Sequence, residues 1–177
     1  MGGADTIVET DETYVGGKAR NRATRKPAPK KAVVALIQRD GKARSFHVAN
    51  VNAEDVRALI VTHVDRASHL MTDESPVYVR LGREFTGHSV VNHGLKEYVT
   101  TGGFKHSNTA ENFFSIFKRG VIGVYHHMSE AHLGRYTAGF DFRYNTRTIA
   151  DGERAAIALK GSIGKRLTYR PPDRLAA

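Results

Sequence analysis

Residues 6–15 read TIVETDETYV and are followed directly by Gly16 and Gly17. Because β-branched and aromatic residues favour extended backbone and paired glycines interrupt it, we expect a strand that ends at Gly16. The next stretch, residues 18–31, holds seven basic residues, two prolines and no acid. This composition indicates a cationic loop, which is either a contact for a polyanion or an ordinary solvated loop.

Two further strands are expected after this loop. Residues 32–38 are apolar, and residues 43–49 alternate between polar and apolar side chains. Asp40 and Gly41 lie between them and give a strong hairpin signal.

The rest of the chain is predicted to alternate between helices and strands. Asn52, with Asp55 three residues later, is typical of a helix N-cap, and we expect this helix to end near Ser68. The other expected elements are a strand at 69–72, a short helix at 76–81, a strand at 89–91, helices that begin at 108 and 129, and a last helix at 153–159.

This order of elements predicts an α/β fold with a mixed five-stranded sheet flanked by helices. The first three strands are joined by short connections and must be antiparallel neighbours, whereas a helix crosses to the fourth, which can lie parallel to the first. We expect residues 1–150 to form one domain. Residues 151–177 are expected to form a C-terminal helix and tail packed on the same domain.

Composition narrows the possible functions. The chain has 177 residues, 27 Lys and Arg against 18 Asp and Glu, and a net charge of +9, which favours a nucleic-acid partner. It has no cysteine, which excludes disulfides, thiolate zinc sites and cysteine nucleophiles. The longest apolar run, residues 32–37, is far shorter than the roughly 20 residues that span a membrane. We therefore expect a soluble intracellular protein with no membrane partner.

Three acidic residues are candidates for a shared site. Asp11 lies in the first strand and Asp73 directly follows the fourth, so adjacent parallel strands would bring both carboxylates to one edge of the sheet. Glu111 lies in the first turn of a later helix that can return to this edge. Because three convergent carboxylates repel each other, such a cluster would need divalent cations, and oxygen ligands suit Mg²⁺ or Mn²⁺. Two such ions can catalyse phosphoryl transfer.

Spacing alone leaves other interpretations of these acids open. Asp73 could be a solvated turn residue, Asp11 a charge on an edge strand, and Glu111 half of a capping box with Asn108. Lys118 falls on the same helical face as Glu111 and could meet a DNA phosphate, or it could be an ordinary lysine at a helix C-terminus.

Other residues carry similar alternatives. His106 could contact phosphate or lie solvated in a glycine-rich loop. Arg143 and Arg147, one helical turn apart, could face DNA or complement a helix C-terminus. An aromatic series at helical spacing is predicted to be core rather than a surface for base stacking; it comprises Phe113, Phe114, Phe117, Tyr136, Phe140 and Tyr144.

Four motifs give the chain a family resemblance. They occupy residues 8–17, 71–74, 106–119 and 132–147, and together they cover residues 6–148. In these motifs the chain resembles the integrase-type catalytic domain of bacterial insertion-sequence transposases of the ISXO-like group, a branch of the DDE transposases.

The resemblance implies an RNase H-like fold and two Mg²⁺ or Mn²⁺ ions held by Asp11, Asp73 and Glu111. It implies cleavage of DNA at transposon ends and joining of the freed 3′-hydroxyl to target DNA, by a homodimer or larger assembly in the bacterial cytoplasm, associated with the nucleoid. Lys118 matches the basic residue after the third acid, and Arg119 belongs to the same motif. The alternatives are an RNase H-like nuclease and a degenerate nucleic-acid-binding domain without catalysis.

The chain departs from the family pattern in two ways. Gly139 stands where such sequences usually carry Glu, which puts helix stability in doubt more than the metal site. Full-length relatives also carry an N-terminal DNA-binding region before the first strand. We therefore expect a fragment, a truncated reading frame or a decayed copy.

Overall fold

The computed structural model of the chain describes residues 1–16, 30–91 and 108–165. Most of the basic stretch, residues 18–29, lies outside this part, as does His106.

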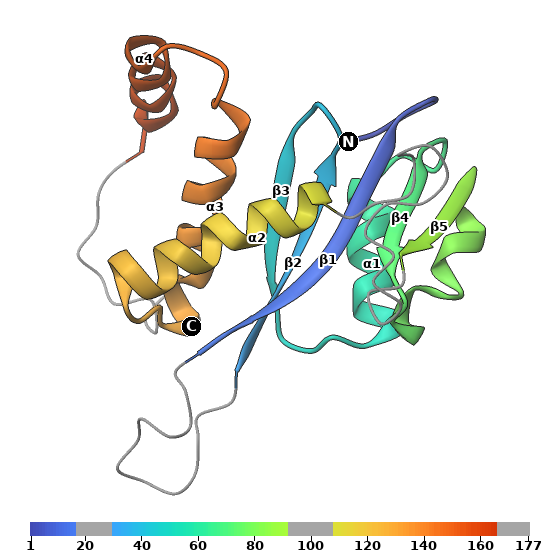
Figure 1. Cartoon of the computed structure of the whole chain (residues 1–177). Coiled ribbons are helices and arrows are strands. Elements are labelled where there is room, and N and C mark those ends of the chain that lie inside the picture. Colours follow the sequence, from blue (N-terminus) through green and yellow to red (C-terminus); the bar gives the residue numbers. More distant parts are fainter. Residues whose placement is uncertain (17–29, 92–107, 166–177) are drawn as a thin grey trace, which may run out of the picture.

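One mixed sheet forms the centre of the molecule, with strand order β3-β2-β1-β4-β5 (Figure 1). Its strands are β1 (Ile7–Val15), β2 (Lys31–Gln38), β3 (Ala43–Val48), β4 (His69–Asp73) and β5 (Gly87–Val91). β2 pairs antiparallel with β1 and β3, while β4 pairs parallel with β1 and β5. The predicted mixed sheet is confirmed: a tight turn joins β2 to β3, and a helix crosses from β3 to β4, which lies parallel to β1. The connection from β1 to β2, residues 16–30, is longer than the short connection expected between these strands.

Helices cover both faces of this sheet: α1 (Ala53–His63) packs on one face, and α2 (Asn108–Gly120) and α3 (Glu130–Asn145) pack on the other. The other helical segments are α4 (Asp151–Ser162), the short 3-10 helices η2 (Pro76–Tyr78) and η3 (Leu81–Glu84), and a π-helical segment η4 (Val121–Tyr125). The expected short helix at 76–81 is therefore two separate turns, and the last helix is longer than the predicted 153–159.

The first helix ends earlier than its sequence pattern predicts. Asn52 caps it as expected, since its Oδ1 accepts a hydrogen bond from the Asp55 N–H at 2.8 Å. The end predicted near Ser68 is wrong, because α1 stops at His63 and Val64 is already extended. Asp65 then forms a turn in which its carboxylate accepts from the Ala67 N–H at 2.9 Å. This side-chain bond offers the backbone an alternative to the helix.

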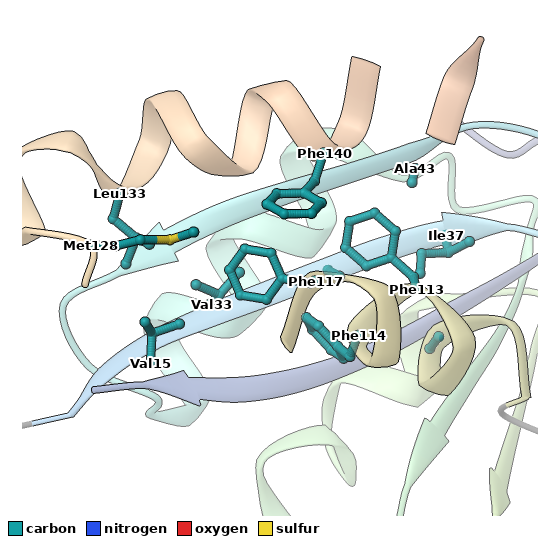
Figure 2. Close-up of a cluster of buried hydrophobic side chains, with 12 residues drawn as sticks. Val15, Val33, Ile37, Ala43, Phe113, Phe114, Phe117, Met128, Leu133 and Phe140 are labelled. Carbon is teal, nitrogen blue, oxygen red and sulfur yellow. The ribbon is translucent and has the colours of Figure 1, made fainter. Parts of the chain in front are cut away.

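The predicted aromatic core is confirmed on one face of the sheet. Phe113, Phe114 and Phe117 of α2 are buried together with Phe140 of α3 (Figure 2). The rings of Phe117 and Phe140 lie edge to face with centroids 5.0 Å apart, a favourable geometry for aromatic pairs. Buried rings of this kind fix α2 and α3 over the sheet and are unavailable for base stacking.

Polar side chains of α3 attach this helix to the outer strand of the sheet. Asn145 accepts from the Ala43 N–H at 2.7 Å and donates to the Ala43 carbonyl at 2.9 Å. One turn earlier, Asp141 accepts from the N–H and the hydroxyl of Ser45 at 2.8 and 2.7 Å. These bonds satisfy backbone groups that an edge strand otherwise leaves unpaired.

The last described helix stands apart from the sheet. No residue of α4 is buried, and Figure 1 shows it projecting beyond α3. Arg154 links it to the end of α3 by donating to the Thr146 carbonyl at 3.1 Å. Within residues 1–16, 30–91 and 108–165, no helix has the length and apolar character needed to cross a membrane.

Candidate metal centre

The parallel pairing of β1 and β4 brings two of the predicted acids together. Glu9 of β1 is in register with Met71 of β4, and Asp11 and Asp73 each lie two residues further on. Asp73 is the last residue of β4, so its side chain lies at the carboxyl end of that strand, where open sheets place ligands.

Local hydrogen bonds orient both carboxylates. Oδ1 of Asp73 accepts from the Ser75 N–H at 3.0 Å, and Oδ1 of Asp11 accepts from the Glu12 N–H at 2.8 Å. Each bond comes from a backbone N–H within two residues, so the local chain fixes the position of each carboxylate.

A third carboxylate, which the sequence analysis missed, joins this pair. Asp11, Glu12 and Asp73 each offer an oxygen, and the three oxygens all lie within 4.8 Å of one another. The three side chains are half-buried, and their oxygen-only donor set fits a hard cation such as Mg²⁺ or Mn²⁺. In a regular strand, neighbouring side chains point to opposite faces, so the sequence pattern gave no reason to group Glu12 with Asp11. The one feature of the sequence that could have pointed to Glu12 is that it directly follows Asp11.

Tyr78 of η2 holds Glu12 in place through a hydrogen bond. Its hydroxyl, in an almost completely buried side chain, donates to Oε2 of Glu12 at 2.5 Å. Burial raises the pKa of Glu12, and the nearby Asp73 charge adds to this effect, while the bond from Tyr78 opposes it. Burial and the Glu12 charge also raise the pKa of Tyr78, so its hydroxyl keeps the proton that it donates.

The third predicted acid lies outside this group. Glu111 is exposed in the first turn of α2, a helix whose start lies over β1 (Figure 1). It is not among the carboxylates whose oxygens lie within 4.8 Å of one another. Its place in the metal centre therefore stays a prediction.

The predicted DNA-binding residues of α2 lie in its last turn. Lys118 and Arg119 are both exposed there. Their contact with DNA stays a prediction, and His106 lies outside the described residues.

Arg143 of α3 and Arg147, two residues after the end of this helix, contact aromatic rings. The guanidinium of Arg147 stacks 4.0 Å from the Tyr144 ring centroid and donates to the Tyr144 carbonyl at 2.8 Å. Arg147 thus complements the end of α3, one of the two alternatives that its position predicts. Arg143 lies 5.8 Å from the Phe140 ring centroid. Both arginines line a pocket of about 180 Å³ between α2 and α3.

The sheet order and the flanking helices define the class: an α/β domain with an RNase H-like fold, the fold of integrase catalytic cores. Among 69 solved chains that match the structure is the catalytic core domain of BIV integrase, with a TM-score of 0.53 and 12% sequence identity. That match covers 88% of this chain and 95% of the integrase chain, and at this identity it shows the fold alone.

The sequence identifies the family. The model of the ISXO2-like transposase domain matches residues 3–145, and the chain belongs to this family. The resemblance found in the four motifs is thereby confirmed. A search among curated proteins gives no match.

Proposed function

We propose that the chain is the catalytic domain of a DNA transposase that cleaves transposon-end DNA and joins the freed 3′-hydroxyl to target DNA. The observation that carries this proposal is the convergence of Asp11 and Asp73 from parallel strands onto one oxygen-lined site, within a transposase-family domain. Membership of the family supports DNA as the substrate.

The side chains of the metal centre divide into holding and supporting roles. Asp11 and Asp73 hold divalent cations, and Glu111 from α2 completes the set. Two Mg²⁺ or Mn²⁺ ions held there by Asp11, Asp73 and Glu111 would supply Lewis-acid chemistry for phosphoryl transfer. Glu12 adds negative charge beside the two aspartates, and the bond from Tyr78 restrains its carboxylate.

Basic residues outside the metal centre would hold the DNA backbone. Lys118 and Arg119 at the end of α2 are exposed and available for phosphate contacts, with Arg143, Arg147 and His106 as further candidates. Since transposition joins two ends, the working form is a homodimer or larger assembly on DNA, in the cytoplasm at the nucleoid.

The substitution Asp73→Asn tests this function. It should abolish Mn²⁺-dependent nicking of supercoiled plasmid DNA, with a loss of roughly 100-fold or more, because an amide cannot replace the charged ligand. The matched control Asp65→Asn changes an acid in the turn after α1 and should keep activity within about twofold. Equal nicking by wild type and Asp73→Asn, at equal urea midpoints, would contradict the proposal.

A strand-transfer assay separates the transposase from a nuclease of the same fold. DNA with a pre-cleaved 3′-hydroxyl end is incubated with target plasmid and Mn²⁺. A transposase gives a joined product, whereas a nuclease gives only shortened strands. Metal-dependent hydrolysis without any joined product would replace the proposed function with nuclease activity.

A further inference from the structure

Glu9 is a buried acid that the proposed chemistry does not use. It lies in the middle of the sheet on β1, and its side chain has no exposed surface. Its Oε1 accepts from the Arg39 guanidinium at 2.6 Å and from the Thr109 hydroxyl at 3.0 Å. Its Oε2 accepts from the Ala110 N–H at 3.0 Å. A carboxylate buried in this way is costly unless such partners compensate it.

Two of these partners belong to the first turn of α2. The N–H groups of a first turn have no acceptor within their own helix, and the helix dipole favours a negative charge there. Such acceptors usually come from the residue just before the helix. Here Glu9 supplies one from a strand about 100 residues away in the sequence. The start of α2 is thus attached to a defined position on β1.

That position links the predicted ligands of the metal. Glu9 lies two residues before Asp11 on β1, and Ala110 directly precedes Glu111 on α2. One buried side chain therefore connects the strand that carries the first acid to the helix that carries the third. Glu9 itself is not among the acids whose oxygens converge at the metal centre.

We propose that Glu9 is a positioning residue, which holds α2 on β1 so that Glu111 reaches the cation bound by Asp11 and Asp73. This inference rests on the proposed function, because it assumes a cation at that site. It differs from a purely structural role in one measurable respect: loss of Glu9 must weaken metal binding, and it must do so through Glu111.

The first test measures Mn²⁺ affinity by calorimetric titration of the protein without DNA. Glu9→Gln should weaken Mn²⁺ binding roughly 10-fold or more, the usual effect of losing a residue that orients a metal ligand. The control is Asn145→Ala, which removes the two hydrogen bonds between Asn145 of α3 and Ala43 of β3 and changes no residue of α2. It should lower the urea midpoint and leave Mn²⁺ affinity within about twofold.

The second test asks whether Glu9 acts through Glu111. In a double-mutant cycle, Glu9→Gln should weaken Mn²⁺ binding in the wild-type background and cause no further loss in the Glu111→Gln background. Additive losses would overturn the proposal, as would equal Mn²⁺ affinity of Glu9→Gln and wild type. Equal weakening by Asn145→Ala would also overturn it, since general destabilisation would then explain the effect.

A milder variant decides the matter if Glu9→Gln does not fold. Thr109→Val removes one hydrogen bond to Glu9 and keeps its pairing with Arg39. A few-fold loss of Mn²⁺ affinity supports the proposal, and no loss overturns it. If the wild-type protein shows no Mn²⁺ binding that depends on Asp73, as judged by Asp73→Asn, the proposed function fails as well. If wild type binds Mn²⁺ through Asp73 while Thr109→Val and Glu9→Gln change nothing, only the role of Glu9 fails.

Discussion

Asp141 is a carboxylate that the fold uses in the core, away from the metal centre. It is half-buried between α3 and β3, where it accepts two hydrogen bonds from Ser45. Burial raises the pKa of Asp141 to about 6, although the bonds from Ser45 and the charge of Arg44 lower it in part. The folded protein therefore binds this proton more tightly than the unfolded chain, in which an Asp titrates near a pH of about 3.9.

This difference predicts a pH dependence of stability. The contribution of Asp141 is most favourable below a pH of about 4 and declines as the pH rises to about 6, because deprotonation costs more in the folded state. In Asp141→Asn this decline is absent. The difference in the free energy of unfolding, wild type minus variant, should therefore fall by about 2 kcal/mol as the pH rises from about 4 to about 6. This value is smaller than the full pKa difference implies, because water partly screens a half-buried carboxylate. Urea titrations from pH 4 to 7.5 measure it, and parallel pH profiles would contradict it.

Helix α3 contains a residue of low helix propensity, Gly139, and its packing on the rest of the domain compensates for it. Gly139 lies on the exposed side of α3, and a Cβ added there would meet nothing within 4 Å. The helix is held instead by Phe140 in the core and by Asp141 and Asn145 on β3. The departure from the family pattern at Gly139 therefore concerns helix propensity and leaves the fold intact.

Gly139→Ala is expected to stabilise the protein by about 1 kcal/mol, because alanine restricts the unfolded chain and favours helix. The matched control is Gly120→Ala at the end of α2, where the new Cβ would lie 2.4 Å from Cζ of the Phe140 ring and should destabilise. Thermal unfolding of both variants measures the effects. A lower melting temperature for Gly139→Ala would show that this glycine has a role the structure does not reveal.

The elements that sequence patterns predicted well are those whose signals are local. β1 and the cap at Asn52 depend on neighbouring residues, and both are confirmed. The end of α1 depends on competition between the helix and the Asp65 turn, which periodicity does not weigh. Glu9 and Glu12 were missed for a related reason. Each is held by a partner far away in the sequence, Ala110 and Tyr78, and strand alternation carries no information about such partners.

At the scale of the whole molecule, topology assembles the site. Asp11 and Asp73 are 62 residues apart in sequence, and only the parallel pairing of β1 with β4 places them side by side. The helical crossover to the fourth strand indicated that this strand can lie parallel to the first, and the structure has that pairing. Whether α2 brings Glu111 to the same cation depends on helix docking, which spacing along the chain does not determine.

Anomalous X-ray scattering from crystals soaked in Mn²⁺ tests the central claim most directly. We predict a manganese peak bonded to the carboxylates of Asp11 and Asp73 at the carboxyl end of β4, and loss of this peak in crystals of Asp73→Asn. Manganese bound only elsewhere on the molecule, or a wild-type site that stays empty at saturating Mn²⁺, would contradict the account.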